Sequence, residues 1–94
     1  MSVRVVRFTG VTQDRIDGLK ARLAEATGPP EGVDSTGVTF LHDADQGTMV
    51  VIQKFDSREQ LDSSEAVLEA MDSGETPGDR VSVDRCDTFA ELGA

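Results

Sequence analysis

The sequence predicts an α+β fold for a single domain over residues 1–94, in the order strand, helix, strand, strand, helix, strand. Two stretches carry this prediction. Residues 47–71 contain a strand with apolar side chains on both faces, which leads through a capped turn into an amphipathic helix. Residues 3–9 form a second strand that is apolar on both faces. A chain of 94 residues forms only a modest core, so its stability depends on burying the apolar faces that it has. We therefore expect both faces of these strands to be covered.

The first strand is predicted over residues 3–9 because this segment is rich in β-branched side chains. Side chains alternate between the faces of an extended chain. One face therefore carries Val3, Val5 and Arg7, and the other carries Arg4, Val6 and Phe8. Gly10 ends the strand.

The first helix is predicted to begin after Thr12, a residue type that accepts hydrogen bonds from the first turn of a helix. Its apolar residues fall at helical spacing and form one stripe: Ile16, Leu19, Leu23 and Ala26. The run Thr-Gly-Pro-Pro at 27–30 ends it, since Gly favours a left-handed cap and Pro cannot continue the turn. Residues 29–37 are predicted to form a loop.

The middle of the chain predicts a β-hairpin. Residues 36–42 alternate, with Val38, Phe40 and His42 on one face and Thr39 and Leu41 on the other. The turn-forming run 43–47 joins them to the strand that carries Met49 and Val51 on one face and Val50 and Ile52 on the other. The two strands are therefore expected to be antiparallel.

The second helix has two possible caps, because Asp56 with Glu59 and Ser57 with Gln60 both have the spacing of a capping box. The polar run 62–65 predicts a break or kink near Asp62, since such residues favour caps over helix interiors. The apolar residues Leu61, Leu68 and Met71, with Val67 beside them, form the buried stripe. Residues 73–78 end the helix, and residues 80–89 form the last strand.

This order of elements is that of the ferredoxin-like fold, an antiparallel four-stranded sheet with two helices on one face. The chain resembles the dimeric α/β-barrel superfamily, and within it the antibiotic-biosynthesis-monooxygenase-like group. The resemblance lies in the hairpin ending in Gly47-Thr48, the run MVVIQKFDSREQLDSSEA, and the last strand after a Gly/Pro loop. It implies a homodimer through the sheet face, with a small apolar or anionic ligand between sheet and helices.

The chain also departs from that group. Its cofactor-free oxygenases and haem-degrading members use Asn, Trp, Tyr or His side chains, and this chain contains no Asn, Trp or Tyr. No functional residue of those branches is carried over. We therefore predict a small-molecule-binding protein without a bound cofactor; the alternative is a cofactor-independent monooxygenase-like or isomerase-like enzyme acting on a small apolar metabolite.

Three residues are the candidate site residues. Arg7 lies on the face of a central strand, where it forms either an ion pair between subunits or an anion contact to a ligand. His42 stands beside the hairpin turn, as a solvated, structural or catalytic imidazole. Glu65 either lines the mouth of a pocket or belongs to a second cap with Ser64. The lone Cys86 is predicted to be a packed strand residue rather than a nucleophile.

Composition excludes several partners. A net charge of −9 repels phosphate backbones, so nucleic acid is not expected. The carboxylates have no metal-ligand spacing, and a single cysteine forms neither an internal disulfide nor a multi-cysteine zinc site. The sequence has neither a run long enough to span a membrane nor the apolar core of a signal peptide. These features predict a cytoplasmic protein with no bound metal and no membrane contact.

Overall fold

The computed structural model describes residues 1–25, 32–71 and 78–93. The elements follow in the predicted order: β1 (Ser2–Thr9), α1 (Gln13–Glu25), β2 (Gly37–Asp43), β3 (Thr48–Phe55), α2 (Arg58–Met71) and β4 (Asp79–Asp87). Three predicted features lie outside the described part of the chain: the Ala26 position with the 27–30 helix stop, the Met71 side chain, and residues 73–77 of the segment predicted to end the second helix. No described helix is long and apolar enough to cross a bilayer.

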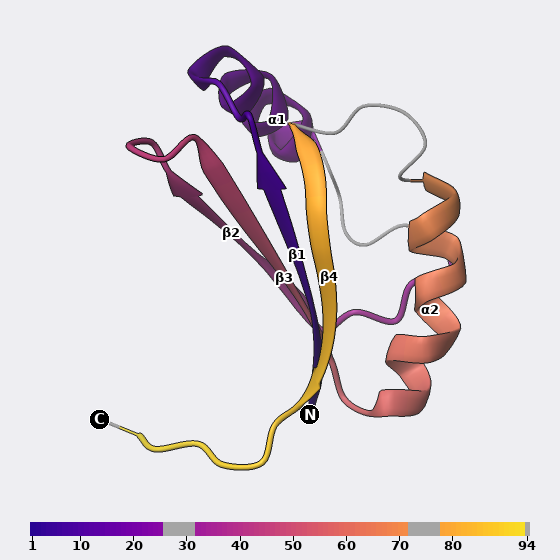
Figure 1. The fold of residues 1–94 in the computed structure, drawn as a ribbon. Coiled ribbons are helices and arrows are strands. Elements are labelled where there is room, and N and C mark those ends of the chain that lie inside the picture. The colour runs from indigo at the N-terminus through magenta and orange to yellow at the C-terminus, as the bar shows by residue number, and fades with distance from the viewer. Residues whose placement is uncertain (26–31, 72–77, 94) are drawn as a thin grey trace.

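The sheet has the order β2-β3-β1-β4 and every neighbouring pair is antiparallel (Figure 1). The first and third strands, which carry apolar residues on both faces, are therefore central, as the predicted ferredoxin-like fold implies. β2 and β4 are the two edges. Asp87 of β4 and Phe55 of β3 both pair with Ser2, and Gly37 of β2 pairs with Lys54. The end of β4 and the start of β2 consequently lie at the same end of the sheet.

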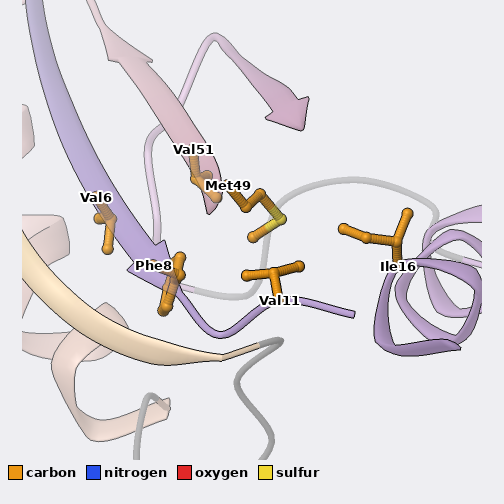
Figure 2. Close-up of a cluster of buried hydrophobic side chains, with 6 residues drawn as sticks. All are labelled: Val6, Phe8, Val11, Ile16, Met49 and Val51. Atoms are coloured by element: carbon orange, nitrogen blue, oxygen red, sulfur yellow. The ribbon is translucent and has the colours of Figure 1, made fainter. Parts of the chain in front are cut away.

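One face of the sheet carries the two helices. At one end, α1 packs its Ile16 on a buried cluster that also contains Val6, Phe8, Val11, Met49 and Val51. Figure 2 shows Met49 and Val11 between the sheet and Ile16. Thr12 caps α1 as predicted, since its hydroxyl oxygen accepts the Arg15 backbone N–H at 3.3 Å.

A second buried cluster fixes α2 at the other end of the same face. It contains Phe55 of β3, Leu61 and Leu68 of α2, and Val33 of the loop before β2. Ser57 is the cap, because its hydroxyl oxygen accepts the Gln60 backbone N–H at 3.2 Å.

The predicted break near Asp62 is wrong, since α2 runs without interruption through this position. Each polar residue of the run has a partner compatible with a helix. The buried Ser64 hydroxyl oxygen accepts the Asp34 backbone N–H at 2.9 Å, and Ser63 donates to the Gln60 carbonyl oxygen. Asp62 pairs with Arg58 one turn earlier. Contacts to the loop before β2 therefore override the local preference for a cap.

The last strand is also shorter than predicted, ending at Asp87 rather than at residue 89. Its partner β1 begins at Ser2, so the chain beyond Asp87 has no strand residue to pair with. The Thr88 N–H donates to the Met1 carbonyl oxygen at 2.9 Å. Residues 88–93, called here the C-terminal arm, then leave the sheet (Figure 1).

Close packing before β4 makes Gly78 a test of the fold. A Cβ at Gly78 would overlap the Thr9 carbonyl oxygen and lie 2.9 Å from Cγ2 of Val11. We expect Gly78→Ala to lower the free energy of unfolding by about 1–3 kcal/mol. The matched control is Gly18→Ala in α1, where a Cβ meets no atom within 4 Å. It should raise the free energy of unfolding by about 0.5–1 kcal/mol. Urea unfolding measures both, and equal effects would contradict the packing described.

Candidate functional site

The three candidate residues do not form one site. Arg7 is exposed on the face opposite the helices, next to Val50 and Ser82 on the flanking strands. His42 is exposed at the hairpin end of β2, paired with Met49 on the helix side. Glu65 lies on α2 and is half-buried, where it contacts Arg4 and Arg85. The interpretation of Glu65 as part of a second cap is wrong, because the helix continues through it.

A buried arginine, Arg4, forms the polar centre of the molecule. It is only 2 % exposed and lies on the helix side of β1, beneath α2. Its guanidinium donates from Nη2 to Glu69 Oε1 at 2.7 Å, from Nη1 to Gln53 Oε1 at 3.0 Å, and from Nε to Glu65 Oε2 at 3.3 Å. These bonds satisfy a charge that is costly to bury without partners.

Two further arginines extend this network to β4. Arg80 donates to both Glu69 oxygens, at 3.0 and 2.9 Å, and Arg85 Nε donates to both Glu65 oxygens at 2.6 Å. Each carboxylate is thus shared between Arg4 and one β4 arginine. We call this set the Arg4 cluster: Arg4, Gln53, Glu65, Glu69, Arg80 and Arg85.

The network keeps its groups charged. Hydrogen bonds from Arg80, and then from Arg4, hold the pKa of Glu69 below its ordinary value. The hydrogen bond to Glu65 raises the pKa of Arg85. A carboxylate with a lowered pKa is a weak base and is not protonated near neutral pH, so Glu69 is poorly suited to general acid or base catalysis. The stability that its pairs contribute is present above the unfolded-state pKa and is lost as the pH falls through the lowered, folded-state value.

Arg4 is not among the candidate residues predicted from the sequence, although two features of the sequence point to it. Arg4 shares its face of β1 with Val6 and Phe8, which are the residues that belong to the core. On α2, Glu65 and Glu69 are four residues apart and so point to the same side, one turn from each other. A cation on the apolar face of a central strand requires such carboxylates.

The helix side of the edge strand β2 remains exposed. Val38 and Phe40 are 46 % and 37 % exposed, and the His42 side chain follows them on the same face. These three residues, called here the β2 strip, lie beside Gln53, Val51 and Met49 of β3. The strip is therefore an apolar surface that ends in an imidazole.

The face opposite the helices, called here the open face, is apolar at its centre. Val3 and Val5 of β1 and Val50 and Ile52 of β3 are half-buried, and Leu41 of β2 is 50 % exposed. Cys86 lies on this face opposite Val3 and is exposed, so the prediction that it is a packed residue is wrong for the single chain. The strand β4, to which it belongs, has no neighbour on its outer edge in the described sheet.

The described residues contain no group of three or more His, Cys, Asp or Glu side chains that is placed to hold a metal ion. The lone described imidazole, that of His42, and the lone thiol, that of Cys86, lie on opposite faces of the sheet. They therefore do not form a nucleophile and base pair within one chain.

No protein-family model matches this chain, and no curated protein matches it. A solved structure, that of Rv0793 from Mycobacterium tuberculosis, is similar with a TM-score of 0.60 over 98 % of both chains. The two sequences are 20 % identical, so the likeness concerns the fold. It supports the α+β assignment, with βαββαβ order and a four-stranded antiparallel sheet.

The buried guanidinium of Arg4 gives a direct test of the network. We expect Arg4→Met to lower the free energy of unfolding by about 1–3 kcal/mol, because Gln53, Glu65 and Glu69 each lose a hydrogen bond from Arg4, although Arg85 and Arg80 still pair the two carboxylates. Arg15→Met removes the same charge from an exposed position of α1 and should change stability by no more than about 0.5 kcal/mol. Chemical denaturation compares the two variants. If Arg4→Met lowers the free energy of unfolding by no more than Arg15→Met does, the network does not have a stabilising role.

Proposed function

We propose that the protein is a homodimeric small-molecule-binding module of the dimeric α/β-barrel superfamily, in its antibiotic-biosynthesis-monooxygenase-like group. The observation that carries the proposal is the sheet itself. Its helix side is packed by α1 and α2, while its open face carries Val3, Val5, Val50 and Ile52 with no covering element in the described chain. A one-sided antiparallel sheet normally presents polar side chains to water, so this face favours a partner.

A second copy of the chain suits this face for two reasons. An apolar patch can pack on itself about a two-fold axis, which is the commonest symmetry of soluble oligomers. The open face carries Arg7 and Lys54 together with Asp43, Asp79 and Asp84, so its charges nearly balance, whereas the chain as a whole has a net charge of −9. Contact at this face therefore avoids stacking the acidic surfaces of two chains. Arg7 is then placed for an ion pair between subunits.

The β2 strip is the proposed ligand surface. Val38 and Phe40 offer apolar contact on the helix side, and the polar groups of His42 and Gln53 lie at its margins. The helix leucines do not contribute to this surface, because Leu61 and Leu68 are buried against Phe55 and Leu19 packs on the cluster around Ile16. A small apolar or anionic molecule on the strip fits this arrangement.

Binding is favoured over catalysis by the state of the charged groups. Glu65 and Glu69 are each held between arginines, and the pKa of Glu69 is lowered by Arg80 and Arg4. Arg7 and His42 lie on different faces, so they do not act on one substrate atom within a chain. A bound molecule would thus contact side chains that are not placed as a proton donor and a proton acceptor acting on the same substrate atom.

The homodimer predicts a clear response to charge on the open face. Val50 is half-buried on that face, so Val50→Glu should convert a dimer into a monomer at micromolar concentration, since an unpaired buried charge costs several kcal/mol. Ala24→Glu adds the same charge to an exposed position of α1 and should leave the dimer intact. Sedimentation equilibrium measures the masses. A wild-type monomer at these concentrations, or equal behaviour of the two variants, would refute the dimer.

The ligand surface is tested with octanoate, octanol and octylammonium as probes of one chain length and three charges. In an NMR titration we expect octanoate and octanol to shift the backbone amides of residues 38–42 most strongly, and octylammonium to shift them less. Phe40→Ser should weaken binding at least fivefold through lost apolar contact, on the order of 1 kcal/mol. His42→Ala should keep the affinity within about twofold, because this imidazole is exposed beside the turn. Chemical-shift changes centred on residues outside 38–42 would show that the β2 strip is not the binding site.

A further inference from the structure

Gln53 lies between the buried Arg4 cluster and the exposed β2 strip. In the register of the sheet its neighbours are Arg4 on β1 and Val38 on β2. It shares the helix side of β3 with Val51 and Phe55, which are buried, whereas Gln53 itself is half-buried. A polar side chain therefore stands where the ion-pair network meets the apolar strip.

Arg4 fixes the orientation of the Gln53 amide. Nη1 of Arg4 donates to Oε1 of Gln53 at 3.0 Å. A guanidinium group has donors only, so the amide oxygen and not the amide nitrogen must face it. The two N–H donors on Nε2 are on the other side of Cδ and are directed away from β1, the strand that carries Arg4. The neighbouring strand on that other side is β2.

The Nε2 group of Gln53 donates to no acceptor among the described residues. It is also accessible, because the only buried side-chain polar atom without a partner in the described part of the chain is Oε1 of Gln60 on α2. The Gln53 amide therefore offers its N–H donors to a molecule that lies over Val38.

The Arg4 cluster makes the surroundings of this donor positive. Its three arginines and two glutamates leave a net charge of +1, since the amide is neutral. The chain as a whole has a net charge of −9, so this region is a local exception. A hydrogen bond to a carboxylate is roughly twice as strong as one between neutral groups. A carboxylate beside Nε2 gains from the bond and from the field, whereas an ammonium group gains from neither.

The rest of the β2 strip sets the direction of the ligand. Phe40 is two residues along β2 from Val38, about 7 Å, and His42 is four residues away, about 13 Å. A head group held by Gln53 is therefore remote from the imidazole. Its apolar tail extends from Val38 over Phe40 toward the hairpin turn.

We propose that Gln53 determines the specificity of the β2 strip: oriented by Arg4, it donates from Nε2 to a carboxylate oxygen of a ligand whose apolar tail covers Val38 and Phe40. This inference rests on the proposed function, and it narrows the ligand from apolar or anionic molecules to amphipathic carboxylates. Arg4 is a positioning residue, because its buried guanidinium contacts the amide and acts on the ligand through it.

The first experiment compares octanoate, octanol and octylammonium binding to the wild-type chain and to Gln53→Glu by NMR titration. The glutamate keeps an oxygen for Arg4 but replaces the N–H donors with a second acceptor and adds a negative charge. Octanoate should bind the variant at least tenfold more weakly, octylammonium at least threefold more tightly, and octanol within threefold. Gln13→Glu makes the same change at an exposed position of α1 and should keep all three affinities within twofold.

The second experiment tests the donor and its orientation, with thermal unfolding measured on each variant. Octanoate should shift the side-chain amide resonances of Gln53 more than octanol does at equal saturation. Gln53→Met removes the donors without adding charge, so it should weaken octanoate at least fivefold and octanol less than twofold. In Arg4→Met the amide is free to turn, so the ratio of octanoate affinity to octanol affinity should fall at least threefold.

The outcomes separate this inference from the proposed function. If no probe shifts residues 38–42, both fail. If the probes bind the strip and Gln53→Glu changes their affinities equally or not at all, the ligand surface stands and the role of Gln53 fails. An unchanged affinity ratio in Arg4→Met removes the positioning role of Arg4. Opposite changes for octanoate and octylammonium in Gln53→Glu support the proposal.

Discussion

Burial of the Arg4 guanidinium under α2 is the constraint on which the arrangement of the sheet and the second helix depends. A side chain that is 2 % exposed and permanently charged must find carboxylates, and α2 supplies two of them one turn apart. Leu61, Glu65, Leu68 and Glu69 recur at i, i+4, i+7 and i+8, so they share the face of α2 that looks toward the sheet. The apolar members enter the Phe55 cluster and the acidic members reach Arg4, which fixes how the helix is rotated on the sheet.

The same constraint explains how far the sequence could predict the site. Alternation correctly divided β1 into two faces, but each face carries valines and one arginine. Which arginine is buried depends on which face α2 covers, and that choice follows from Glu65 and Glu69, far along the chain. Both Arg4 and Arg7 lie on the central strand β1, but α2 covers only the face that carries Arg4. Sequence periodicity identifies which residues share one face of a strand. Which element covers that face is determined by the tertiary structure.

The misplaced boundaries of the elements have a similar cause. The polar run in α2 favours a cap by local chemistry, and the bond from the Asp34 N–H to Ser64 overrides it. Strand-forming residues continue past Asp87, and the strand ends there because β1 supplies no further pairing residue. In contrast, strand order and pairing were predictable, since the two-sided apolar strands had to be central and the 43–47 turn had to join neighbours. The fold leaves function open, because one architecture hosts many activities, so the functional argument rests on the placement of individual side chains.

The proposed homodimer has to form against the charge of the chain. A chain with a net charge of −9 repels its own copies, most strongly at low salt. In the proposed homodimer, apolar contacts between the two open faces must exceed this repulsion.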